Sequence, residues 1–89
     1  MGVWQARAQD GDVEAMFSLG MTYELGLHGT LEDDGEAYAW YTLAAAAGHK
    51  DALHRQGMLA ALMNPLDLAR ALARTQELHG EVLAWQGVR

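Results

Sequence analysis

Cysteine is absent from this 89-residue chain. Without thiols, the chain can form neither a disulfide framework nor a thiolate metal site. Isoleucine is also absent and only four valines occur, so a fold built mainly from strands, which favour β-branched residues, is not expected. A domain of this size is only marginally stable, so its stability must come from efficient burial or from contacts beyond the chain.

Long apolar runs are missing as well, because Arg, Asp, Glu or His interrupts every apolar stretch. We therefore expect no membrane-spanning segment and no membrane partner. The opening residues, MGVWQARAQD, lack the basic and apolar regions of a secretory signal. This favours a cytoplasmic location, unless a leader has been removed.

Basic residues are scarce, and the net charge of the chain is −6. All of the excess negative charge lies in residues 1–50, whereas residues 51–89 are balanced. An acidic half repels phosphate backbones, so nucleic-acid binding is disfavoured and a basic partner would fit better. A solvated acidic face that keeps a small domain soluble is the simpler alternative.

Residues with catalytic chemistry are few. Ser18 is the only serine, and no base is evident for it in the sequence. His28 and the acids of residues 32–34 could offer metal ligands, but their spacing matches no known metal loop. Acids that precede a helix have an ordinary capping role. The sequence therefore predicts neither an enzyme nor a bound metal or cofactor.

Helix signals, by contrast, follow one another along the chain, which contains sixteen alanines. Asp12 is a candidate N-cap and Gly26 a candidate C-terminal glycine of a first helix. Asn64, followed by Pro65, is a strong start for a later one. The four expected helices lie within residues 11–26, 29–48, 49–63 and 64–87, and residues 3–10 form a shorter fifth piece.

These helices repeat with an offset of 37 residues. The offset carries one set of positions onto another: Gly11, Ala15, Gly20, Met21 and Leu25 fall on Gly48, Ala52, Gly57, Met58 and Leu62. It also carries the Val3-Trp4 pair onto Trp40-Tyr41. Self-similarity at such a spacing is typical of an α-solenoid, in which stacked helical hairpins share one core.

The repeat has a recognisable motif. The string A-x-x-x-L-G-x-x-Y-x-x-G begins at Ala15, and D-x-x-x-A-x-x-W-Y-x-x-A-A-x-x-G begins at Asp33. Together they resemble the Sel1-like repeat, a relative of the tetratricopeptide repeat. The resemblance implies an all-α, right-handed superhelix of antiparallel hairpins. It divides one domain, 1–89, into the tail of a preceding repeat (1–10), a full repeat (11–48) and a degenerate repeat with a capping helix (49–89).

The motif positions predict packing roles. Gly20 and Gly57 lie inside helices, where glycine is unfavourable, so we expect another backbone to approach closely at both positions. Core packing is also a better account of the aromatic residues than a ligand cage. The predicted structural residues are Ala15, Leu19, Gly20, Tyr23, Ala37, Trp40, Tyr41, Ala44, Ala45, Gly48, Ala52 and Gly57. Ala46 and Ala47 are expected to face outward.

A second apolar stripe runs along the first helix. In tetratricopeptide-like hairpins, which this repeat resembles, the corresponding stripe lines the concave surface. The stripe and its edge comprise Glu14, Phe17, Met21, Glu24 and Leu25, and the next hairpin adds Asp51, His54, Met58 and Leu62. We expect an apolar, acid-edged groove suited to an amphipathic or extended peptide. Alternatively, the C-terminal helix or a second copy of the chain covers it.

The sequence therefore predicts a non-catalytic protein-interaction module or adaptor, without a cofactor, that binds a protein or peptide with a basic segment. Two alternatives stay open. In one, the domain is structural, and self-association as a homodimer fills the groove. In the other, the domain positions a catalytic neighbour.

Overall fold

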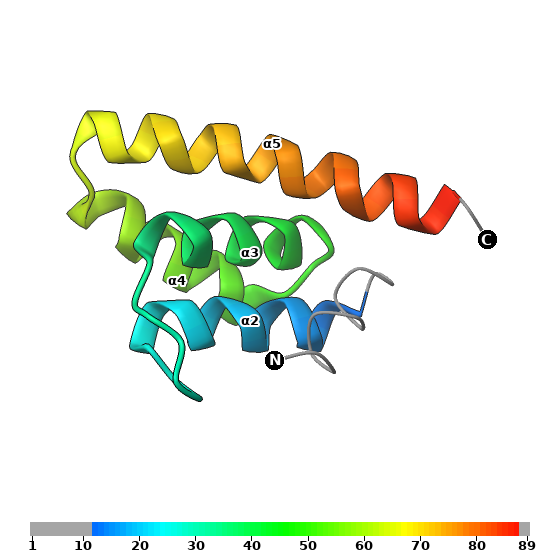
Figure 1. Cartoon of the computed structure of the whole chain (residues 1–89), viewed down its shortest axis with the longest axis horizontal. Coiled ribbons are helices and arrows are strands. Elements are labelled where there is room, and N and C mark those ends of the chain that lie inside the picture. The colour runs from blue at the N-terminus through cyan, green and yellow to red at the C-terminus, as the bar shows by residue number, and fades with distance from the viewer. Residues whose placement is uncertain (1–11, 88–89) are drawn as a thin grey trace.

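The computed structural model describes the backbone of residues 12–87 and the side chains of residues 12–82. In this part four helices follow in order: α2 (Val13–Leu25), α3 (Asp34–Ala46), α4 (Lys50–Leu62) and α5 (Pro65–Gly87). Successive helices reverse direction (Figure 1), and residues 12–87 contain no strand. The predicted all-helical hairpin fold is therefore confirmed, whereas the right-handed twist stays a prediction. The short piece at residues 3–10, assigned to a preceding repeat, lies outside the described residues.

The helix ends follow the local chemistry of the sequence. A side-chain oxygen of Asp12, Asp33 and Asn64 each accepts a hydrogen bond from the backbone N–H three residues further on, at 2.8–3.1 Å. These bonds satisfy amides that have no partner inside the helix. Gly26 and Gly48 follow α2 and α3 with φ values of 65° and 101°, which favour glycine. The boundaries predicted at Asp12, Gly26, Gly48 and Asn64 are confirmed, whereas the start of α3 after Asp33 lies later than the beginning of the predicted range, 29–48.

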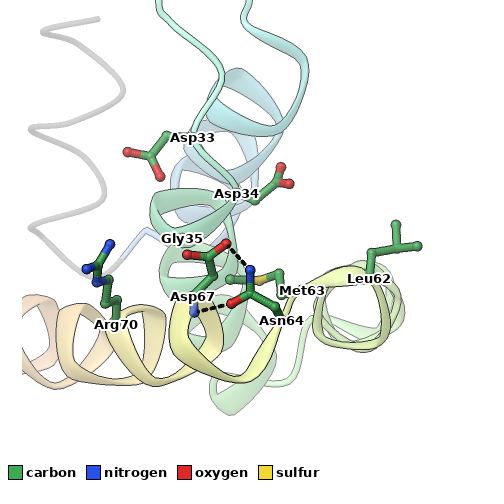
Figure 2. A pocket seen from close by; sticks show the side chains of 8 residues that line it. All are labelled: Asp33, Asp34, Gly35, Leu62, Met63, Asn64, Asp67 and Arg70. Carbon is green, nitrogen blue, oxygen red and sulfur yellow. Dashed lines mark hydrogen bonds between the residues drawn. The ribbon is translucent and has the colours of Figure 1, made fainter.

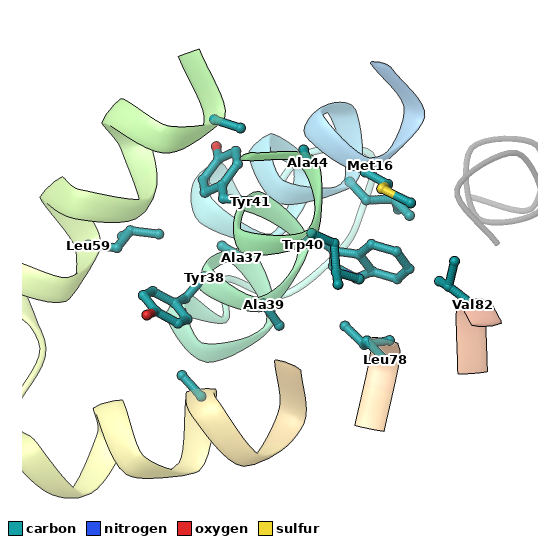
Figure 3. Packing of buried hydrophobic residues seen from close by; sticks show 14 of the residues in the cluster. Met16, Ala37, Tyr38, Ala39, Trp40, Tyr41, Ala44, Leu59, Leu78 and Val82 are labelled. Atoms are coloured by element: carbon teal, nitrogen blue, oxygen red, sulfur yellow. The ribbon is translucent and has the colours of Figure 1, made fainter. Parts of the chain in front are cut away.

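Helix α3 lies at the centre of the fold, and α2, α4 and α5 all pack against it. Buried side chains therefore occur all around α3, in contrast to the single apolar stripe of a surface helix. Figure 3 shows Trp40 between Met16 of α2 and the side chains of Leu78 and Val82 on α5. The core consists of Ala15, Met16, Leu19, Ala37, Tyr38, Ala39, Trp40, Tyr41, Leu43, Ala44, Ala52, Leu59, Ala71, Leu78 and Val82.

The alanine run divides as the sequence predicts. Ala44 is fully buried and Ala45 half-buried, whereas Ala46 and Ala47 are exposed. A small side chain at a buried position allows neighbouring helices to approach α3 closely, and an exposed alanine only favours helix formation. The run thus serves both as a packing surface and as a helix former.

The 37-residue repeat is visible in the helices themselves. Both ends of α4 lie 37 residues after the corresponding ends of α2, at Val13 and Lys50 and at Leu25 and Leu62. Their first turns also pack alike, because Ala15 and its equivalent Ala52 are both fully buried. The division of the chain at residues 11–48 and 49–89 stays a prediction.

Helix α5 differs from the second helix of a complete hairpin. It packs along α3 and makes little contact with α4, from which only two residues separate it. In α4, Gln56 and Ala60 replace Leu19 and Tyr23 of α2, so this side of α4 offers little apolar area to hold a helix. The C-terminal helix therefore caps the first hairpin and leaves part of α4 uncovered.

Candidate partner-binding groove

A groove of about 540 Å³ lies between α2 and α4. Phe17 and Met21 of α2 line one side of it, and residues of α4 line the other: Asp51, His54, Arg55 and Met58. Four of the six residues predicted to form its apolar surface are brought together here: Phe17, Met21, His54 and Met58. They meet because α2 and α4 present equivalent positions on equivalent faces.

Phe17 is the anchor of the groove. Its ring stacks on the imidazole of His49, with centroids 4.2 Å apart and an angle of 20° between the planes. The Phe17 ring also lies 5.7 Å from the ring of Tyr41, and the guanidinium carbon of Arg55 is 6.0 Å from its centroid. These contacts hold a half-buried aromatic ring in one orientation.

One edge of the groove carries a paired charge. Glu24 accepts a hydrogen bond from the Tyr41 hydroxyl at 2.6 Å and one from Arg55 at 3.1 Å. Burial, followed by the hydrogen bond to Glu24, raises the pKa of the Tyr41 hydroxyl above its ordinary value. Glu24, which the sequence analysis expects at the groove edge, therefore has its carboxylate paired with Arg55 and Tyr41.

His49, which directly precedes α4, lies beside Phe17 on another side of the groove. Its Nδ1 accepts a hydrogen bond from the backbone N–H of Ala52 at 3.1 Å, so the imidazole caps the helix. Its Nε2 lies 3.2 Å from a carboxylate oxygen of Glu14, whose side chain is 75% exposed. With Nδ1 acting as an acceptor, Nε2–H is left to donate to Glu14. Glu14 does not line the groove itself, and its carboxylate is paired with His49.

Sequence reasoning missed both His49 and Arg55 as parts of this site. The 37-residue offset could have identified His49, because it places this residue at the position of the N-cap Asp12. Nothing in the sequence links Arg55 to Glu24, which lies 31 residues earlier.

Two residues predicted for the apolar surface, Leu25 and Leu62, do not line the groove. Leu25 is 49% exposed at the end of α2, and Leu62 is 80% exposed at the end of α4. Leu62 instead lines a second pocket of about 510 Å³, drawn in Figure 2, where α4 ends near the beginnings of α3 and α5. Acidic residues line that pocket (Asp33, Asp34 and Asp67, with Arg70), so it offers no comparable apolar surface. The groove accordingly ends before the last turn of both helices.

The two helical glycines differ from the prediction. At Gly20 the nearest atoms belong to a side chain and not to a backbone, since an added Cβ would lie 2.5 Å from two carbons of the Tyr41 ring. At Gly57 an added Cβ would have nothing within 4 Å. The steric explanation therefore holds at Gly20 with a side chain in place of a backbone, and it is wrong at Gly57, where no described residue covers the helix.

The remaining structural residues are more uniform. Trp40 and Tyr41 are buried, as are the motif alanines apart from Ala45, while Tyr23 is half-buried against the core. Burial and the negative charge of Glu36 raise the pKa of Tyr23.

Within residues 12–87, no helix is long and apolar enough to cross a bilayer. The described residues also contain no group of three or more His, Cys, Asp or Glu that could hold a metal ion.

This geometry defines a class of protein: a helical-hairpin repeat with a concave apolar surface. Comparison with family profiles then identifies the repeat, since residues 13–49 match the Sel1 repeat. Residues 13–49 are therefore a Sel1-like repeat, and repeats of this family generally mediate protein–protein interactions. Comparisons with curated proteins and with solved structures give no significant match.

Proposed function

We propose that this domain is a non-catalytic adaptor that binds a peptide segment of a partner protein in the groove between α2 and α4. The observation that supports this most strongly is the convergence of Phe17 and Met21 with His54 and Met58 on one open groove. Binding would follow from burial of apolar side chains of the peptide against these residues.

The charge around the groove supports a basic segment in the partner. Asp51 lines the groove, and the exposed carboxylate of Glu14 lies beside His49, whose ring stacks on Phe17. Arg55 is paired with Glu24, so it adds little free positive charge. A lysine or arginine in the peptide would therefore find an acidic edge, which favours selection and association rate more than affinity.

Selection from a displayed library of random 16-residue peptides tests the proposal. We expect the wild-type domain to enrich peptides that combine apolar side chains with Lys or Arg. Met21→Glu and Met58→Glu should abolish this enrichment, because each introduces a charge into the apolar surface. Failure of the wild type to enrich any peptides, or enrichment unaffected by both substitutions, would contradict the proposal.

Leu31→Glu is the matched control. Leu31 is 86% exposed outside the helices and does not line the groove, so this variant adds the same charge without altering the surface. Met58 is itself 49% exposed, so Met58→Glu should fold even where Met21→Glu does not. Light scattering over a range of concentrations distinguishes the adaptor from the self-association alternative, because only the latter predicts a concentration-dependent mass.

A further inference from the structure

His49 makes three contacts at once beside the groove. Its Nδ1 accepts a hydrogen bond from the backbone N–H of Ala52 at 3.1 Å, and its Nε2 lies 3.2 Å from a carboxylate oxygen of Glu14. Its ring stacks on Phe17, with centroids 4.2 Å apart, and only 12% of its side chain is exposed. One imidazole therefore ties the start of α4 to α2 and to the aromatic anchor of the groove.

The cap on α4 requires a neutral imidazole. Nδ1 can accept a hydrogen bond only while it carries no hydrogen, and the tautomer protonated at Nε2 satisfies both bonds at once. The other helix starts in residues 12–87 are capped through a side-chain oxygen, at Asp12, Asp33 and Asn64. Among these four starts, only that of α4 depends on a nitrogen that protonation turns from an acceptor into a donor. Histidine is also the residue that ordinarily changes charge between about pH 5 and 8.

Protonation would place a hydrogen between Nδ1 of His49 and the backbone N–H of Ala52. Two donors then face each other at the positive end of α4, so the ring has to turn away from the helix start. The bond from Nε2–H to Glu14 remains possible in the protonated form. The imidazole thus loses the cap and keeps Glu14, and its stack on Phe17 changes with its position.

The charged groups around His49 act in both directions. They are Asp12 and Glu14 at the start of α2, Lys50 and Asp51 in the first turn of α4, and Arg55 one turn further on. Glu14 is in contact with the imidazole, but its side chain is 75% exposed, and attraction between exposed charges is weak. The last turn of α3 adds no charged side chain, although its Ala44 carbonyl accepts from the backbone N–H of His49 at 3.0 Å. The attraction to Glu14 therefore does not replace the cap that protonation removes.

We propose that protonation of His49 loosens the groove, which binds its peptide near neutral pH and releases it in mild acid. This regulation rests on the proposed function of the groove, whereas the change at His49 occurs in the free domain. Without its cap, the first turn of α4 frays, and Asp51, which lines the groove, belongs to that turn. Phe17 at the same time loses the ring that holds it in one orientation. A peptide has to restore both before it binds, so its affinity should fall by about fivefold, the equivalent of a typical N-cap.

NMR of the free domain tests the change at His49, with the pH lowered from about 8 to about 5. At the higher pH, the imidazole nitrogens of His49 should show a hydrogen on Nε2 only. On acidification, the amide of Ala52 and the ring of Phe17 should shift with the same midpoint as the imidazole of His49. A hydrogen on Nδ1 at the higher pH, or Ala52 and Phe17 signals that do not follow His49, would overturn the proposal.

Peptide affinity then tests the consequence for the groove. The probe is a peptide selected on the wild-type domain, at the higher pH, from the displayed library. Its affinity for the wild type should fall about fivefold at the lower pH. His49→Asn should bind it equally at both pH values, because asparagine caps helices without changing charge.

His54→Asn is the matched control. His54 lines the groove but lies within α4 and does not cap it, so this variant should retain the fall in affinity. No fall in the wild type, a fall that persists in His49→Asn, or one that disappears in His54→Asn would overturn the proposal. A library that yields no peptide would contradict the proposed function alone, since the change at His49 is measured in the free domain.

Discussion

At the scale of the residue, Tyr41 links the core to the proposed site. Its ring fills the space over Gly20 and stands beside Phe17, while its hydroxyl donates to Glu24 at the groove edge. A single buried side chain therefore sets both the packing of α2 on α3 and the position of a charged pair. Loss of its hydroxyl alone separates these two roles.

Tyr41→Phe should preserve the fold and reduce the free energy of unfolding by about 1.5–3 kcal/mol, the usual range for a hydrogen bond to a charged group. In the wild type, the raised pKa of Tyr41 means that the folded state holds the phenolic proton more tightly than the unfolded chain. The stability that the protonated Tyr41 hydroxyl contributes is fully present below the ordinary tyrosine pKa of 10.0, and it is lost as the pH rises above that value.

Urea unfolding at several pH values between neutral and strongly alkaline measures both effects. As the pH rises, the free energy of unfolding should fall less in Tyr41→Phe than in the wild type. Some decrease should remain in the variant, because the pKa of Tyr23 is raised as well. If the free energy of unfolding decreased equally with rising pH in the wild type and in Tyr41→Phe, the role given to this hydroxyl would be contradicted.

At the scale of the element, the helices that local signals define were predictable, and the path of the last one was not. The side chains of Asp12 and Asn64 cap the helices that follow them, which is why these two starts could be predicted from the sequence. The course of α5 depends on its apolar side chains Leu78 and Val82, which meet Trp40 on α3. Such a preference between two possible partner helices is a tertiary effect that no local motif encodes.

The junction between α4 and α5 gives a test at this scale. Asn64 accepts from the backbone N–H of Asp67 at 2.8 Å and donates to its carboxylate at 3.0 Å. Asn64→Ala should therefore destabilise the domain by about 1 kcal/mol, as expected for a lost N-cap.

Thermal unfolding followed by circular dichroism measures this difference. Asn64→Ser is the control, since serine also caps helices and should retain most of the stability. Equal destabilisation by both substitutions would mean that the cap is not what Asn64 contributes.

At the scale of the whole molecule, the repeat gives the site its shape. The sequence predicted the contributions of Phe17, Met21, His54 and Met58, because an offset of 37 residues aligns α4 with α2. It overestimated the length of the groove, since Leu25 and Leu62 stand at helix ends beyond it. The pairing of Glu24 with Arg55 was not predicted, because it joins residues from different helices.

Not all of the acidic residues behind the net charge of −6 present an unpaired negative charge to a partner. Part of it is neutralised inside the fold, by Arg55 at Glu24 and by Arg74 at Glu36. Asp51 lines the groove and Glu14 lies beside His49, where a basic segment could meet them. Specificity for such a segment is therefore expected to weaken as the salt concentration rises.

The most direct test of the central claim is chemical-shift mapping of a library-selected peptide on the ¹⁵N-labelled domain. We expect the amide signals of Phe17, Met21, His54 and Met58 to shift together, and their shifts to saturate as the peptide concentration rises. Met58→Glu should remove these shifts, and Leu31→Glu should leave them unchanged. Shifts that saturate elsewhere on the domain, or that persist in Met58→Glu, would contradict the assignment of the groove as the partner-binding site.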